Sequence, residues 1–167
     1  MMYLSIFLML TVSASRELAM NLNTPFTLSI KLDLVDAKSN SYTYSDLVFV
    51  AVYGLIKNGP RLLKPIYKSI IAILSNLAPY TKSLCKEACD GLMYLLTIFA
   101  KKEFLLERED NCKTLGSLIE AVNYLIAYHD ESNHYLQIQL MKYQTIFDFL
   151  ESNLPDIGVD RPRLNQQ

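Results

Sequence analysis

Residues 62–80, LLKPIYKSIIAILSNLAPY, constrain the fold of this chain more than any other stretch of its sequence. Pro65 fits the first turn of a helix, where its missing N–H costs nothing, and Pro79 ends the helix because the residue before a proline is pushed out of helical geometry. A helix this apolar needs neighbours on more than one side, so we predict that it is the centre of the core. Its apolar residues at helical spacing are Ile66, Ile70, Ile73, Leu74 and Leu77, and Ile71 and Ala72 widen the apolar face beyond a single stripe.

Helical spacing of apolar residues recurs along the rest of the chain. The predicted neighbours of the central helix are helices over residues 44–57 and 84–102, and further helices are predicted over 3–12, 115–129 and 135–152. Short polar loops join them, so the sequence predicts an all-α fold of about six helices. Because successive helices each need two neighbours, we expect armadillo- or HEAT-like stacking, a segment of a helical solenoid, more than a closed four-helix bundle.

Three local features interrupt the helical pattern. Residues 26–34 alternate apolar and polar side chains, which predicts one short extended segment that has no second alternating run to pair with. Residues 107–113, EREDNCK, are the densest charge cluster and are predicted to form a solvated loop. Gly91 lies inside a predicted helix, where glycine costs about 1 kcal/mol relative to alanine, so we expect another helix to approach closely there.

The length of the chain is that of one domain, at 167 residues and 19.1 kDa. We predict a helical domain over residues 1–155. Residues 156–167 contain few large apolar side chains and are predicted to be a disordered tail or the start of a linker. The net charge of −1 gives no electrostatic reason to expect nucleic acid as a partner.

The apolar run over residues 3–12, followed by small residues at 13–15, permits two interpretations. It resembles the apolar region and cleavage site of a secretory signal, but no Lys or Arg precedes it, and it is shorter than the roughly 18 apolar residues of a membrane span. These observations favour a buried helix. The alternative is a small secreted or membrane-tethered helical protein that uses residues 3–15 as a signal or anchor.

The cysteines and histidines are the residues that could carry chemistry. Cys85, Cys89 and Cys112 are odd in number and form no C-x-x-C pair, which favours reduced, buried thiols over a disulfide framework or a zinc site. His129 and His134 flank the acidic loop that begins at Asp130, and a hydrolase or metal enzyme could be built on these three residues. They lack the i, i+4 spacing of helical ligands, however, so a solvated loop is the favoured interpretation.

The sequence contains no glycine-rich phosphate loop, G-x-S-x-G or H-E-x-x-H motif. We therefore predict no catalytic, cofactor-binding or metal-binding residues, and a protein that is not an enzyme and acts through contacts. Tyr124, Tyr128 and Tyr135 cluster near the histidines and could form part of a recognition surface, although half-buried helix residues are the simpler interpretation.

Several phrases, taken in order, resemble the Hid1 family, the high-temperature-induced dauer formation proteins. The most specific is SNLAPYTKSL at residues 75–84, and the likeness covers most of residues 3–155. The other phrases are LNTPF at 22–26, SDL at 45–47, GPRLLKP at 59–65, LIEAVNYLIAY at 118–128, DESN at 130–133 with Leu136, and Ile146-Phe147 leading to NLP at 153–155.

This resemblance implies a location and a function. Members of the family look like long helical-repeat proteins on the cytosolic face of the Golgi and trans-Golgi network, implicated in secretory sorting and dense-core vesicle formation and not known as enzymes. The chain is then expected to be an internal fragment of such a scaffold, a peripheral membrane protein whose partners belong to the vesicle-sorting machinery. Family members carry an N-terminal glycine for myristoylation, whereas Met1-Met2-Tyr3 has none, so no direct lipid anchor is assigned.

Overall fold

The computed structural model describes residues 2–26 and 42–153. Within these residues the chain forms α-helices and short 3-10 turns, and the β pairing is limited to an isolated bridge between Pro25 and Thr43. The prediction of an all-α fold is therefore confirmed. The predicted extended segment beyond Phe26 and the predicted tail over 156–167 lie outside the described residues.

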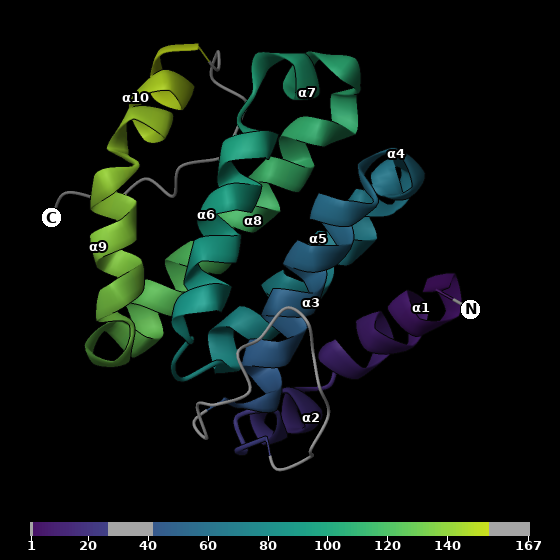
Figure 1. The fold of residues 1–167 in the computed structure, drawn as a ribbon, viewed down its shortest axis with the longest axis vertical. Helices are drawn as coiled ribbons and strands as arrows, with labels where there is room; N and C mark the ends of the chain where they lie inside the picture. Colours follow the sequence, from purple (N-terminus) through teal and green to yellow (C-terminus); the bar gives the residue numbers. More distant parts are fainter. Residues whose placement is uncertain (1, 27–41, 154–167) are drawn as a thin grey trace, which may run out of the picture.

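The helices follow one another with short connections (Figure 1). The α-helices are α1 (Met2–Ser13), α2 (Arg16–Asn21), α3 (Tyr44–Asn58), α4 (Pro60–Leu63), α5 (Tyr67–Leu77), α6 (Lys86–Phe99), α7 (Lys102–Glu107), α8 (Glu109–His129), α9 (His134–Lys142) and α10 (Gln144–Asn153). The 3-10 turns are η1 (Lys64–Ile66), η2 (Ala78–Tyr80) and η3 (Asp130–Ser132).

Helix α5 is the buried centre that the sequence predicts. Pro65 lies in η1 just before it and Pro79 lies in η2 just after it, as expected from the effect of proline on helix ends. Ile70, Ile71 and Leu74 have no exposed surface at all. The core therefore surrounds α5 on more than one side.

The longer helices pack in two rows (Figure 1). In one row α1 packs on α5 and α5 packs on α8; in the other row α3 packs on α6 and α6 packs on α9. Contacts of α3 with α5 and of α6 with α8 join the rows. Large side chains such as Phe49 of α3 and Phe99 of α6 are fully buried in the resulting core.

The charge cluster at residues 107–113 is not a loop, and that prediction is wrong. Helix α7 ends at Glu107 and α8 begins at Glu109, so most of the cluster forms the first turns of α8. Glu109 and Asp110 lie at the positive end of the helix dipole, where acidic side chains stabilise a helix. Lys113 forms an i, i+3 ion pair with Asp110, with 3.4 Å between the nitrogen and the oxygen.

One predicted helix is divided in the structure, and another ends early. The helix predicted over 135–152 is α9 followed by α10, whereas the helix predicted over 84–102 is α6, which ends at Phe99, and the short helix α7 begins only at Lys102. Tyr143 separates α9 from α10, and its backbone N–H donates to the carbonyl oxygens of Gln139 and Leu140. A change of direction that keeps the backbone hydrogen-bonded leaves the apolar spacing almost intact, which explains why the spacing did not reveal it.

Helix α1 forms where the sequence predicts a helix, but only one of its faces is buried. Ile6 and Ser13 are buried, whereas Leu4 and Phe7 are 68% and 67% exposed. The expectation of a buried helix is therefore right for the face toward α5 and wrong for the opposite face. In the described ranges, none of the helices combines the length and the apolarity needed to cross a membrane.

Gly91 allows α3 and α6 to approach closely, as the sequence predicts. A Cβ atom built on Gly91 would lie 2.9 Å from the Cβ atom of Tyr53, closer than real Cβ atoms come. Gly116 in α8 is different, because a Cβ atom there would meet nothing within 4 Å.

We expect opposite effects from alanine at these two helical glycines. Gly91→Ala should lower the free energy of unfolding by about 1–2 kcal/mol, because α3 must move away from α6. Gly116→Ala should raise it by about 0.5–1 kcal/mol, because alanine favours the helix and meets open space. Urea denaturation of both variants tests this, and a stabilised Gly91→Ala variant would contradict the close approach of α3.

Candidate functional site

The structure does not assemble a site from the two histidines. His129 is the last residue of α8, His134 is the first residue of α9, and η3 with Asp130 lies between them. His134 is exposed, whereas His129 is half-buried and its Nε2 atom has no hydrogen-bond partner in the described part of the chain. Among the described residues, no three His, Cys, Asp or Glu side chains are arranged to hold a metal ion.

The three tyrosines divide into a stacked pair and a separate residue. The rings of Tyr124 and Tyr128 stack with centroids 5.7 Å apart. A hydrogen bond of 3.1 Å from the Tyr124 hydroxyl to Glu120 is the main cause of a raised pKa at Tyr124. Tyr135 points elsewhere and donates to Asp90 of α6 at 2.9 Å. A shared recognition surface of all three tyrosines is therefore not formed.

The cysteines are free thiols in a largely buried setting. Cys89 has no exposed surface, and desolvation, followed by the nearby Asp90 carboxylate, raises its pKa to about 12. Desolvation and then the Asp46 carboxylate raise the pKa of Cys85 strongly. A protonated thiol is a poor nucleophile, so neither group is prepared for catalysis.

These raised pKa values predict a loss of stability in alkali. A folded-state pKa above the unfolded value of about 8.5 contributes stability that is complete below that pH and is lost as pH rises toward 12, by up to about 1.4 kcal/mol per pH unit for each thiol. Urea denaturation between pH 8 and pH 11 should therefore show a falling free energy of unfolding. Cys89→Ala should show a shallower fall, and an unchanged slope in this variant would refute the assignment to Cys89.

The connection between η2 and α6 is fastened by side chains from several distant parts of the chain. We call residues 80–85 the junction segment. Asn23 holds its first part: the side-chain amide donates to the Tyr80 carbonyl oxygen at 2.7 Å, and the Lys82 backbone N–H donates to the Asn23 amide oxygen at 2.9 Å. The buried hydroxyls of Ser45 and Thr81 share a hydrogen bond of 2.8 Å.

Asp46 joins the start of α3 to the start of α6. One carboxylate oxygen accepts the backbone N–H and the hydroxyl of Thr43, at 2.8 and 2.9 Å, and completes a capping box at α3. The other oxygen accepts the backbone N–H of Cys85 at 2.7 Å, at the N-cap of α6. The positive ends of both helix dipoles therefore face this buried carboxylate, which explains how an acidic side chain can be only 3% exposed.

Asn133 holds the last part of the junction segment. Its side-chain oxygen accepts the Leu84 backbone N–H at 3.0 Å, and its side-chain amide donates to the carbonyl oxygens of Leu125 and His129 near the end of α8. The Asn133 side chain thus ties the start of α6 to the last turn of α8. The buried polar side chains of this region serve structure rather than a reaction.

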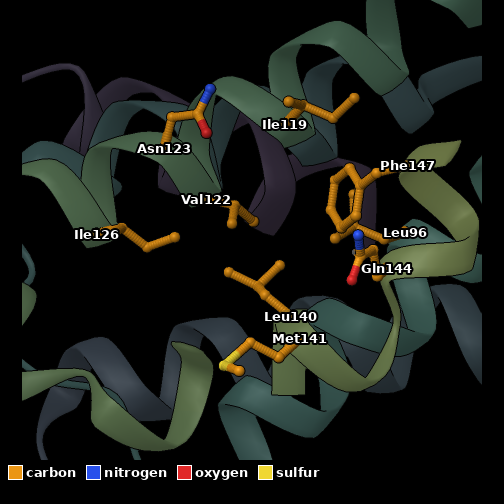
Figure 2. Close-up of a pocket in the computed structure, with 9 residues that line it drawn as sticks. All are labelled: Leu96, Ile119, Val122, Asn123, Ile126, Leu140, Met141, Gln144 and Phe147. Carbon is orange, nitrogen blue, oxygen red and sulfur yellow. The ribbon is translucent and has the colours of Figure 1, made fainter. Parts of the chain in front are cut away.

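Open apolar surface is the remaining feature that could support a function. A groove of about 320 Å³ runs between α8 on one side and α9 and α10 on the other (Figure 2). We call it the C-terminal groove. Apolar side chains make up most of it, with two amides among them: Leu96, Ile119, Val122, Asn123, Ile126, Leu140, Met141, Gln144 and Phe147. The sequence does not predict this groove, because apolar spacing indicates that a helix face is buried without showing which part of that face has no neighbour.

The described residues define an all-helical class of protein, in which buried polar side chains such as Asp46 and Asn133 hold the helices together. The model of one family, the high-temperature-induced dauer-formation protein (Hid1) family, matches residues 1–166, and the chain belongs to this family. It is 33% identical over 144 residues to the protein HID1 of Dictyostelium discoideum, covering 86% of this chain and 16% of that protein. It is 28% identical over 155 residues to the protein HID1 of Homo sapiens, covering 93% of this chain and 19% of that protein.

The chain therefore spans less than a fifth of the length of either relative. No solved structure matches it. Three of the stretches that carry the family resemblance contribute side chains to the junction segment, because Asn23, Ser45, Asp46 and Asn133 belong to them and all bind residues 80–85.

Proposed function

We propose that this chain is a non-enzymatic helical scaffold that takes part in secretory sorting and dense-core vesicle formation at the cytosolic face of the Golgi and trans-Golgi network. The proposal rests on membership of the Hid1 family, because the family resemblance implies this role for its long helical members. The chain would act through contacts with proteins of the sorting machinery. The buried side chains that bind the junction segment hold the helices together, as we expect in such a scaffold.

The packing of the helices in two rows supports an armadillo- or HEAT-like solenoid as the architecture of this scaffold. Stacked pairs such as α3 with α5 and α6 with α8 each contact the neighbouring pair, as helix pairs do in solenoids. In this arrangement a longer family member would continue the rows on either side. The chain would then be one segment of a larger binding surface.

The C-terminal groove is the contact site that we propose for a partner. Met141 projects into it from α9 and is 77% exposed, and an unbranched thioether adapts to apolar partners of varied shape. The partner expected here is a protein segment that presents apolar side chains to the groove and polar groups to Asn123 and Gln144.

A pair of variants on one helix tests this proposal. Met141→Glu places a charge at the groove, whereas Ile138→Glu changes a residue that is 50% exposed on the same helix but does not line the groove. Immobilised wild-type chain and Ile138→Glu should retain Golgi sorting proteins from a Golgi-enriched membrane extract. Met141→Glu should retain at least about tenfold less, because burying an unpaired charge opposes binding.

The proposal fails if folded wild-type chain retains no Golgi or vesicle protein while a longer family member retains them under the same conditions. The alternative of a small secreted or membrane-tethered protein has a separate test. N-terminal sequencing of the cellular product that found residues 3–15 removed would favour secretion. We prefer the scaffold because α1, which contains most of these residues, packs on α5 as part of the fold.

A further inference from the structure

We draw no further inference here: the strongest candidate, the apolar groove between α1 and α3 together with the exposed outer face of α1 beside it, carries no proposal because nothing in the structure shows what covers it.

Discussion

Replacing Asp46 with alanine should lower the free energy of unfolding by roughly 3–5 kcal/mol. The variant loses the capping box of α3 and the carboxylate that accepts the Cys85 backbone N–H at 2.7 Å. The backbone N–H groups of Thr43 and Cys85 are then left without their acceptor in a region from which water is largely excluded, which is the costly case for a broken hydrogen bond. Urea denaturation monitored by circular dichroism measures the loss.

Two further variants show whether the loss comes from both helix starts. Asp46→Asn keeps an oxygen for the Cys85 N–H but cannot accept the Thr43 N–H with its other atom, so it should lose about half as much. Asp110→Ala removes a carboxylate that is 61% exposed and should change stability by less than about 0.5 kcal/mol. If Asp46→Ala stayed within about 1 kcal/mol of wild type, Asp46 would not be holding the two helices.

Introducing a carboxylate at Ile73 should abolish cooperative unfolding or cost at least about 4 kcal/mol. Ile73 is 3% exposed on α5, the helix that contacts α1, α3 and α8. A carboxylate in Ile73→Asp must either lose its hydration or become protonated, and no basic side chain lines the groove between α1 and α3 that Ile73 borders. Thermal melts of the purified variant show the effect directly.

Lys113→Asp is the matched substitution to an acidic residue on the surface. It breaks only the exposed ion pair with Asp110 and should be nearly silent, within about 0.5 kcal/mol. Similar melting temperatures for the Ile73→Asp and Lys113→Asp variants would mean that α5 is not the centre of the core.

The helices with strong end signals could be predicted from the sequence. Thr43 or Ser45 as a cap, with Asp46 in the first turn, predicts the start of α3, and the structure has Thr43 as the N-cap in a capping box with Asp46. Pro65 and Pro79 bracket α5. The start of α8 was missed because the cluster at 107–113 was interpreted by its charge alone. Glu109 and Asp110 at the head of an apolar repeat are themselves typical of a helix start.

The candidate surfaces could not be predicted, for a physical reason. Helix α1 is apolar on every side, so its sequence gives no direction in which the buried face should point. The junction segment was equally hidden, because Asn23, Asp46 and Asn133 reach residues 80–85 only once the helices have packed. Side chains that bind across 39 to 59 residues of sequence leave no local pattern.

The junction segment also bears on how the chain unfolds. In a stack of repeats that contact only their neighbours, the free energy of folding is a sum of terms for single repeats and for neighbouring pairs. One end of such a stack can therefore unfold while the other end stays folded. Here three separate segments, around residues 23, 46 and 133, converge on residues 80–85, so losing any one of them exposes backbone groups that belong to another helix pair. Long-range hydrogen bonds of this kind couple distant helices, and we expect the described part of the chain to unfold as one cooperative unit.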